Sequence, residues 1–532
     1  MSKALKGILC AVILIILAST VSAQVGTAWV SRYDGPGNVG DQANALVVDD
    51  SGYVYVTGTS NGTGFVDGED FATIKYKPNG DTVWVRRYNG PGNVTDNAYD
   101  LAVDDSGNVY VAGSDNFNAF YVTIKYRRNG TTAWVRRLAG SNMVAYALAV
   151  DSSRNVYVTG YGETGATDID IVTIKYSPGG TALWTSIYNG PDSVWDYASA
   201  IAVDDGGNVY VTGIVDWPIS PPYDAIDYVT IKYAPNGDTL WVRRYNGSGN
   251  DVDAARALAL DDSGNVYVTG ASVVSGATFD YATIKYKSNG DTAWVRNYNG
   301  PGNADDGARA VAVDSSGNVY VTGGSTGSGT NSDYATIKYA ANGDTVWVRR
   351  HNGPDNFGDY AAALAVDKSG NVFVTGLENT NASSQDHATV KYMPNGDTAW
   401  VKRYNGPFNV YDAASAIAVD TSGNVYVTGT SQGTVSSTDY ATIKYSACVA
   451  KPGDANASND YSLGDAISIV NYIFNKPGCS PTPLCWLSSL LCRGDWDGSS
   501  TVSLSDVIRA VNFIFSKPGG PWNALPVGVC CL

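Results

Sequence analysis

The sequence predicts an all-β fold, an eight-bladed β-propeller of four-stranded blades, followed by a small α-helical module. Three short markers each occur eight times within residues 24–447, and the Thr-Ile-Lys-Tyr marker among them recurs at steps of 50 to 57 residues, which is the period of a propeller blade. Each unit also contains four strand signals separated by turn residues. After residue 447 the repeat stops, and six of the seven cysteines fall in residues 448–532.

The markers are a Thr-Ile-Lys-Tyr tetrapeptide, a Val-Tyr-Val-Thr-Gly pentapeptide and a tryptophan. In the fifth unit the strand signals cover residues 257–260, 266–269, 281–286 and 292–298. The turns between them contain Ser-Gly-Asn and Asn-Gly, which are strong hairpin signals between β-branched and aromatic runs. Four antiparallel strands per unit are typical of a propeller blade. The repeated tryptophans are Trp29, Trp84, Trp134, Trp184, Trp241, Trp294, Trp347 and Trp400.

The phase of the repeat predicts how the ring closes. The chain after the leader starts with a fourth-strand signal at residues 27–33, and the eighth unit ends after its third strand at residues 441–445. The N-terminal strand should therefore complete the last blade and remove the open edge of the ring. A seven-bladed ring with an unpaired eighth unit and a non-propeller solenoid are the alternatives.

The Asp-Ser-Gly-Asn-Val-Tyr-Val-Thr-Gly core of the units resembles the SBBP family of bacterial β-propeller repeats, over about four fifths of the chain. The resemblance implies an exported bacterial surface or extracellular protein. It implies no reaction. The family is named for seven blades, whereas eight complete units are present here.

Residues 1–23 resemble a secretory signal peptide, and we expect a secreted, extracellular or cell-surface protein. Lys3 and Lys6 give a positive start, residues 7–17 are apolar, and residues 21–23 are a small-residue cleavage site. The apolar run is short for a membrane span. A retained N-terminal anchor is the alternative.

The composition argues against a nucleic-acid partner and against catalysis. The formal net charge is −16 and the pI is near 4.5, whereas phosphate binding needs a basic face. Only two histidines occur, and His351 and His387 occupy positions held by tyrosines in other units. The glutamates Glu69, Glu163 and Glu378 are assigned to strand two-to-three loops as scattered charge. We therefore predict no catalytic residue.

Aspartates recur at two fixed phases. The series before strand one is Asp41, Asp96, Asp196, Asp253, Asp306, Asp359 and Asp412, and the series before strand three is Asp70, Asp170, Asp227, Asp280, Asp333, Asp386 and Asp439. Both are expected to skip the second blade, at Ala145 and Phe120, which suggests that the pair works as a unit. The two interpretations are turn capping, in which a carboxylate accepts backbone N–H groups, and a ring of calcium or cationic-ligand sites.

The C-terminal residues contain two matching loops, each followed by a helix-period apolar run. The loops place oxygen ligands at the spacing of a 12-residue calcium loop, so we predict two calcium ions. A helical hairpin without metal is the alternative. The predicted calcium ligands are Asp454, Asn456, Ser458, Asp460, Ser462 and Asp465 in the first loop, and Asp495, Asp497, Ser499, Thr501, Ser503 and Asp506 in the second.

This duplicated loop–helix pattern resembles a type I dockerin over residues 453–517. The resemblance implies calcium-dependent docking to a cohesin-like protein or a cell-surface assembly. An even number of cysteines in an exported module predicts disulfides, whose pairing stays open. The disulfide candidates are Cys448, Cys479, Cys485, Cys492, Cys530 and Cys531.

Taken together, these features predict a secreted or cell-surface, non-enzymatic binding or scaffold propeller. The alternative is a dockerin-tethered, polysaccharide-degrading glycosidase or lyase, and a third class is a structural filament subunit. The strand two-to-three loops vary most between units, which is where binding is expected on a repeat scaffold. In the longest of them, Trp217 and Tyr223 are the predicted ligand-binding residues, for a carbohydrate or a peptide.

Overall fold

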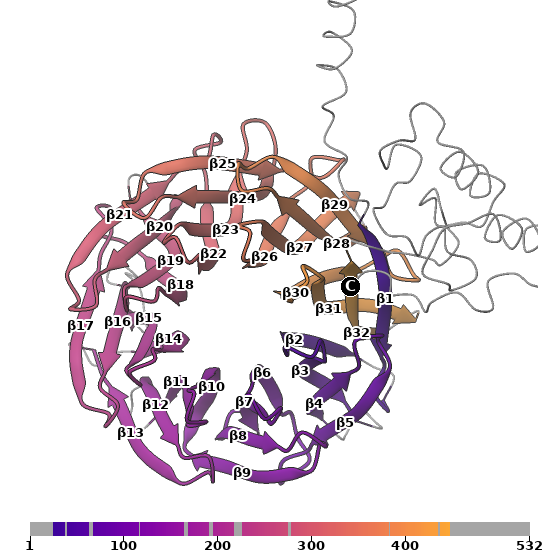
Figure 1. Cartoon of the computed structure of the whole chain (residues 1–532). Helices are drawn as coiled ribbons and strands as arrows, with labels where there is room; N and C mark the ends of the chain where they lie inside the picture. Colours follow the sequence, from indigo (N-terminus) through magenta and orange to yellow (C-terminus); the bar gives the residue numbers. More distant parts are fainter. Residues whose placement is uncertain are drawn as a thin grey trace, which may run out of the picture. The chain divides into compact units, whose positions relative to one another are not determined.

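The computed structural model describes residues 25–37, 40–62, 68–115, 117–163, 169–190, 195–217, 226–274, 278–381, 384–434 and 437–446. Every regular element in these ranges is a β-strand, 32 in all, and they form eight four-stranded sheets arranged as a ring (Figure 1). Among the described residues there is no helix that is long and apolar enough to cross a membrane. The leader at residues 1–23 and the module at 448–532, with their predicted cleavage, calcium and disulfide residues, lie outside the described residues.

The innermost strand of each blade borders the central opening, and the second strand lies next to it on the outer side (Figure 1). From blade one to blade eight the innermost strands are β2 (Asp41–Val48), β6 (Asn97–Val103), β10 (Ser141–Val150), β14 (Trp195–Val203), β18 (Asp253–Leu260), β22 (Asp306–Val313), β26 (Tyr360–Val366) and β30 (Asp412–Val419). The second strands are β3 (Val54–Asn61), β7 (Val109–Asp115), β11 (Val156–Glu163), β15 (Val209–Trp217), β19 (Val266–Val273), β23 (Val319–Thr326), β27 (Val372–Asn381) and β31 (Val425–Thr434).

The third and fourth strands form the outer half of each blade. The third strands are β4 (Glu69–Tyr76), β8 (Phe120–Tyr126), β12 (Ile169–Tyr176), β16 (Asp227–Tyr233), β20 (Phe279–Tyr286), β24 (Ser332–Tyr339), β28 (Ser384–Tyr392) and β32 (Ser437–Ser446). The fourth strands of blades one to seven are β5 (Thr82–Tyr88), β9 (Thr132–Ala139), β13 (Ala182–Tyr188), β17 (Thr239–Tyr245), β21 (Thr292–Tyr298), β25 (Thr345–His351) and β29 (Thr398–Tyr404).

The predicted ring closure is confirmed. The last sheet has the order β1-β32-β31-β30, so β1 (Gly26–Tyr33) is the outer strand of blade eight. Trp29 also reaches blade one, where its ring lies 6.2 Å from Tyr76 and its Nε1 donates to the Pro78 carbonyl (2.9 Å). The alternatives of seven blades and of a solenoid are therefore wrong.

The repeated tryptophan, tyrosines and lysine join neighbouring blades. Trp134 of blade two packs between Tyr110 of its own blade, 6.2 Å away, and Tyr176 of blade three, 6.0 Å away. Its Nε1 and the Lys125 ammonium both donate to the Pro178 carbonyl in blade three, each at 3.1 Å. The two sequence markers therefore recur because each blade needs the same seam with its neighbour.

The repeated Asp-Ser-Gly-Asn turn is held by its first carboxylate. In blade five, Asp261 accepts the backbone N–H of Ser263 (3.0 Å) and Asn265 (2.9 Å), and also the Tyr267 hydroxyl (2.9 Å). Gly264 adopts a φ of 74°, which a residue without a Cβ accepts readily. The turn and the tyrosine of the next strand therefore recur together, because the turn aspartate accepts the tyrosine hydroxyl.

A β-bulge in every innermost strand explains the last residue of the Val-Tyr-Val-Thr-Gly marker. In blade five, Ala255 and Ala257 pair with Gly270 and Thr269, so Arg256 between them is the extra residue. A Cβ on Gly270 would lie 2.0 Å from the Ala254 carbonyl oxygen, so only glycine fits. The same shift recurs in all eight innermost strands.

Candidate functional site

The loops that enter strands one and three share one face of the ring, because neighbouring strands run antiparallel. We call this face the loop face. The first aspartate series lies there as caps: each carboxylate accepts the backbone N–H of the glycine six residues earlier. The donors are Gly35, Gly90, Gly190, Gly247, Gly300, Gly353 and Gly406. The capping interpretation is therefore confirmed for this series.

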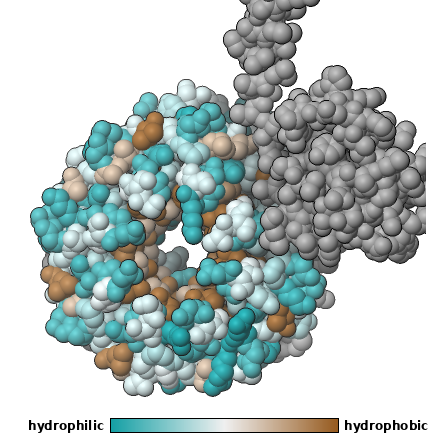
Figure 2. Space-filling view, viewed as in Figure 1, coloured by the Kyte–Doolittle hydropathy of each residue, from teal (hydrophilic) through white to brown (hydrophobic). Residues whose placement is uncertain are grey.

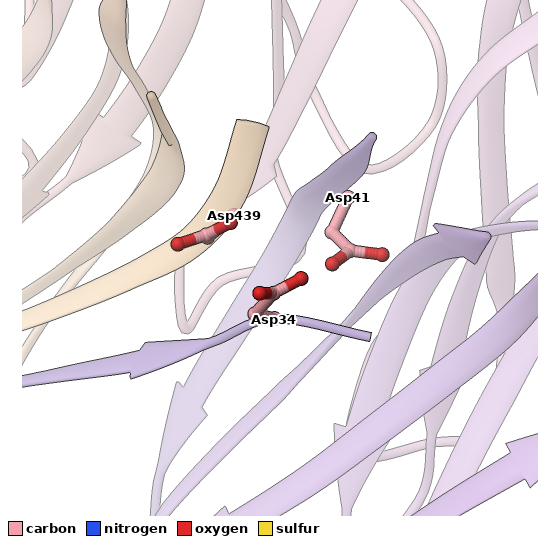
Figure 3. Close-up of side chains that lie close together, drawn as sticks. All are labelled: Asp34, Asp41 and Asp439. Atoms are coloured by element: carbon pink, nitrogen blue, oxygen red, sulfur yellow. The ribbon is translucent and has the colours of Figure 1, made fainter. Parts of the chain in front are cut away.

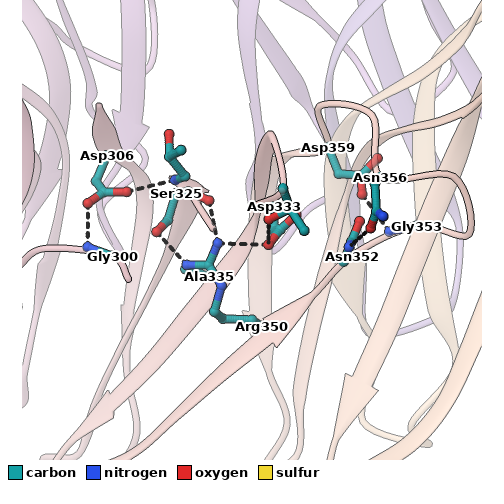
Figure 4. Close-up of polar contacts among 12 residues, drawn as sticks. Gly300, Asp306, Ser325, Asp333, Ala335, Arg350, Asn352, Gly353, Asn356 and Asp359 are labelled. Carbon is teal, nitrogen blue, oxygen red and sulfur yellow. Dashed lines mark hydrogen bonds and ion pairs between the residues drawn. The ribbon is translucent and has the colours of Figure 1, made fainter. Parts of the chain in front are cut away.

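Asp70, Asp227, Asp333 and Asp439 of the second aspartate series form ion pairs with an arginine on the fourth strand of their blade. In blade six, Asp333 Oδ2 accepts Nη2 of Arg350 at 2.8 Å, and the same guanidinium donates to the Ser325 hydroxyl and carbonyl, both at 2.6 Å (Figure 4). Its Nη1 also donates to the hydroxyl of Tyr298 in blade five (3.2 Å). Arg87 in blade one and Arg32 in blade eight make the same four contacts.

A second-series aspartate of one blade lies beside the first-series aspartate of the next blade. The prediction that both series lack their aspartate in the second blade was therefore wrong for the first series. The first-series position of blade three is Met143, eight residues before Asp151, rather than Ala145 in blade two. Its neighbour in the second series is Phe120 of blade two, and Met143 N donates to the Asn118 carbonyl (2.6 Å) just before it. Both carboxylates are therefore missing from the same junction, which agrees with their working as a unit.

Three carboxylates gather where the ring closes. Oxygens of Asp34, Asp41 and Asp439 lie within 4.8 Å of one another, and Figure 3 shows them at the meeting of the chain's first and last strands. Burial raises the pKa of Asp34, and the neighbouring charges of Asp439 and Asp41 add to that shift. Arg32 pairs with Asp439 at 2.8 Å, so part of this negative charge is already compensated.

The bulge residues break the symmetry of the ring. They lie on the strands that surround the central opening, which is hollowed in the space-filling view (Figure 2). Most residues of the innermost strands recur from blade to blade, but the bulge residue differs. From blade one to blade eight the bulge residues are Asn44, Tyr99, Tyr146, Ser199, Arg256, Arg309, Ala362 and Ser415. We call them the bulge ring.

An arc of aromatic rings covers the bulge ring on blades two to four. Tyr99 and Tyr146 stack with ring centres 5.5 Å apart and an angle of 24°. Tyr161 on the adjoining strand contacts Tyr197 of blade four edge to face at 4.6 Å, and Trp195 lies 6.4 Å from Tyr197. Tyr146 is 47% exposed, so the arc offers a ring to solvent.

Two arginines continue the bulge ring on blades five and six. Arg256 and Arg309 are exposed, and neither makes a hydrogen bond or ion pair with another described residue. Enclosure by the surrounding protein lowers the pKa of Arg256, the like charge of Arg309 lowers it further, and the phenols of Tyr228 and Tyr146 oppose the shift. Because Tyr146 lies two blades away from Arg256, both side chains reach into the central opening.

Asp100 is a second residue of the innermost strands that departs from the repeat. It follows the bulge residue of blade two, where every other blade has alanine. Burial raises its pKa to about 6, although its oxygens accept the N–H groups of Leu101 and Leu148, both at 2.8 Å. Asp100 thus joins the innermost strands of blades two and three.

The structure confirms the predicted role of the two histidines but not that of Glu378. His387 is buried and contacts Tyr404 edge to face at 5.4 Å, and His351 contacts Tyr334 at 5.6 Å, so both fill aromatic packing positions as predicted. Glu378 was wrongly assigned to a loop. It lies in β27, fully buried, and binds Arg403 (2.6 Å) and His351 (2.8 Å), because blade seven uses it to neutralise the fourth-strand arginine.

The predicted ligand-binding pair is only partly described. Trp217 ends β15 and pairs with Trp195 of β14 across the sheet, which places it on the loop face. Tyr223 lies outside the described residues. The bulge ring was not predicted, although the sequence carries a signal for it: a variable residue between two alanines, followed by the marker glycine on the next strand.

Comparison with known proteins agrees with this architecture. The family model "Beta-propeller repeat" (SBBP) matches residues 29–65, 83–120, 133–163 and 399–435. The fold and these matches define the chain as a β-propeller repeat protein. More particularly, four segments of its eight-bladed ring match the SBBP repeat model.

A curated relative is an uncharacterized WD repeat-containing protein of Acanthamoeba polyphaga mimivirus, 28% identical over 135 residues and 23% of this chain. The chain spans only 9% of the length of that relative. Similar solved structures include polysaccharide lyase Uly1 (10% identity, 75% of this chain, 89% of that one, TM-score 0.40). Another is the β-propeller domain of the Trilobed protease from Pyrococcus furiosus (10% identity, 68% of this chain, 97% of that one, TM-score 0.40).

Proposed function

We propose that this chain is an exported, non-enzymatic binding protein that holds an anionic ligand at the loop-face mouth of its central opening. The observation that carries the proposal is the bulge ring. Eight blades keep the same packing residues, yet the position that projects into the opening changes from blade to blade. β-Bulges occur often beside functional sites, where they re-aim a side chain.

The charges of the bulge ring favour an anion. The chain carries a net charge of −16, yet Arg256 and Arg309 stand together without an acidic partner among the described residues. Desolvation lowers the pKa of Arg256, and the like charge of Arg309 lowers it further. A carboxylate or sulfate between the two arginines would relieve their repulsion through charge-assisted hydrogen bonds, which are about twice as strong as neutral ones.

The aromatic arc favours a sugar as the carrier of that anion. A sugar ring has an apolar face that packs on tyrosine and hydroxyl groups that need polar partners. Tyr146 offers a ring that is 47% exposed, and Arg256 and Arg309 offer exposed donors to such hydroxyl groups. The ligand class is therefore an acidic sugar chain, and the loop that contains Trp217 and Tyr223 would extend the contact on the same face.

The second candidate is a dockerin-tethered glycosidase or lyase, favoured by one observation: an innermost strand carries a carboxylate, Asp100, whose pKa is raised to about 6. Two features favour binding instead. Both oxygens of Asp100 already accept backbone N–H groups, and burial raises the pKa of Tyr161 and Tyr197 to about 12, which leaves them protonated near pH 7. A general base should have a pKa near the working pH.

The remaining parts of the chain would give this binding protein its location. The leader at residues 1–23 would export it, and the module at 448–532 would bind two calcium ions and dock to a cohesin-like protein or a cell-surface assembly. Calcium binding to a 12-residue loop uses hard oxygen ligands of the kind found at Asp454 and Asp495.

A glycan array with matched acidic and neutral oligosaccharides tests the proposal. We expect the full chain to retain acidic members and to lose them as salt is raised, because exposed charges are screened. Arg256→Ala with Arg309→Ala should weaken the best ligand at least tenfold, about 1.4 kcal/mol. Ser415→Ala, at the same bulge position on blade eight, is the matched control and should leave affinity intact. Shortened products released from that ligand would favour the enzyme instead.

A further inference from the structure

Blade five lacks the fourth-strand arginine that neutralises the second aspartate series. In blade six, Arg350 pairs with Ala335 across the sheet, and in blade one Arg87 pairs with Ala72. The residue in the same register of blade five is Asn297, opposite Ala282. A residue that carries a positive charge in other blades is therefore replaced by a neutral side chain that offers an oxygen.

The oxygens that normally surround this guanidinium are all retained in blade five. Arg350 binds a tyrosine hydroxyl, a serine hydroxyl and carbonyl, and an aspartate carboxylate, as Figure 4 shows in part. The corresponding residues are Tyr245, Ser272 and Asp280. Ser272 and Asp280 face each other across β19 and β20, as Ser325 and Asp333 do in blade six.

Asp280 is left with negative charge and no partner. It is only 5% exposed, and its buried Oδ1 has no hydrogen-bond partner among the described residues, as is also true of Oδ1 of Asp333. The buried hydroxyl of Ser272 likewise has no partner there, whereas the hydroxyl of Ser325 in blade six accepts from Arg350. Within the same ranges Asp280 forms no ion pair, whereas Asp333 binds Arg350 at 2.8 Å. Burial raises the pKa of Asp280, and the nearby carboxylate of Asp306 raises it further. An isolated buried carboxylate is costly unless a cation or hydrogen bonds compensate it.

We propose that blade five binds one calcium ion in the place that the arginine guanidinium takes in other blades. Asp280, the hydroxyl and carbonyl of Ser272, and the side-chain oxygen of Asn297 would supply the protein ligands, and water would complete the shell. Calcium accepts six to eight oxygens in irregular arrangements, whereas magnesium requires a near-ideal octahedron. The mixed carboxylate, hydroxyl, carbonyl and amide set suits calcium better.

The residue at the register of Asn297 distinguishes blade five from the other blades. In blade three the residue is Ile187, which has no oxygen to offer. In blades one, four, six and eight the arginine already supplies the positive charge to the second-series aspartate. In blades two and seven the arginine at this position pairs with Asp115 and Glu378. The proposed ion therefore belongs to blade five alone, and it is distinct from the two calcium ions expected in residues 448–532.

Calcium titration calorimetry and thermal melting of the full chain test this site. All proteins carry Asp454→Ala and Asp495→Ala, so that the C-terminal loops do not contribute. We expect this background to bind one calcium ion and to melt at a higher temperature in calcium than in chelator, because a ligand of the folded state stabilises it. Asn297→Arg should abolish the calcium response and raise the melting temperature in chelator. Asp280→Asn should weaken calcium binding at least tenfold.

A gain-of-site variant is the matched control. Arg350→Asn reproduces the residue pattern of blade five in blade six, so the stoichiometry should rise from one ion to two. A background protein that binds no calcium at millimolar concentration would overturn the proposal. A calcium response that survives both Asn297→Arg and Asp280→Asn would also overturn it, and equal heats with magnesium would overturn the assignment to calcium.

Discussion

Replacing Arg32 with alanine should loosen the ring where its two ends meet. Arg32 belongs to β1, and its guanidinium donates to Asp439 (2.8 Å), to the Ser431 hydroxyl (2.6 Å) and to the Tyr404 hydroxyl (2.8 Å). The substitution removes these bonds together and leaves Asp439, whose side chain is 7% exposed, without its cation.

The magnitude follows from the burial of the pair. Breaking a fully buried ion pair from one side costs about 3–5 kcal/mol, because the remaining charge stays buried. The Arg32 side chain is 24% exposed, so solvent screens part of the interaction and we expect a loss of about 2–3 kcal/mol. Arg350→Ala is the matched control, since Arg350 is 22% exposed and makes the same contacts inside blade six.

Urea denaturation and hydrogen exchange measure the two effects separately. Both variants should lose similar stability, because both remove the same contacts. Only Arg32→Ala should raise exchange along β1 and β32, because β1 has no covalent link to the rest of blade eight. An Arg32→Ala protein with unchanged midpoint and unchanged exchange along β32 would refute the closure account.

The remaining predictions concern the bulge, pH and the C-terminal module. Gly270→Ala should destabilise blade five by several kcal/mol, since its Cβ would lie 2.0 Å from a carbonyl oxygen, and a melting curve like that of the unchanged chain would contradict the bulge requirement. The pKa of Asp100 is raised to about 6, above the unfolded value of about 3.9, so the folded state holds the proton more tightly and stability should fall as pH rises from about 4 to 6. Asp100→Asn should make the pH dependence of the urea midpoint less steep, although Asp253, Asp359 and Asp386 have pKa values raised to about 6 as well and continue to contribute. An equally steep curve would contradict the assignment. Chelator should lower the melting temperature of residues 448–532 and calcium should restore it, whereas calorimetry without calcium heat at millimolar concentration would reject the two-ion prediction.

The sequence was sufficient for the architecture because every blade repeats its seam with the next one. The tryptophan and the Thr-Ile-Lys-Tyr marker recur since each blade must contact its neighbour through Trp, Tyr and Lys, as Trp134, Tyr176 and Lys125 do. The unmatched strands at the two ends of the repeat predicted closure by β1. Strand one of blade five starts at Asp253, four residues before the predicted start, because it continues past the bulge.

The candidate site was harder to predict, because its residues act between repeats. The second-series aspartate of one blade lies beside the first-series aspartate of the next, so comparison within one unit assigned the missing pair to Ala145 instead of Met143. The bulge ring was missed for a related reason. A single variable residue, set between two alanines in seven of the eight blades, resembles ordinary variation, and only the pairing shift reveals that it is the extra residue of a bulge on the innermost strand.

Binding of a uronate oligosaccharide to the full chain, compared with its neutral counterpart by calorimetry, tests the central claim most directly. The account predicts that the acidic oligosaccharide binds, that its neutral form binds at least tenfold more weakly, and that Arg256→Ala with Arg309→Ala removes this preference. It also predicts that Ser415→Ala preserves both affinities. Equal binding of the two oligosaccharides, or an acidic preference that survives loss of both arginines, would contradict the assignment of Arg256 and Arg309 as the anion-binding residues.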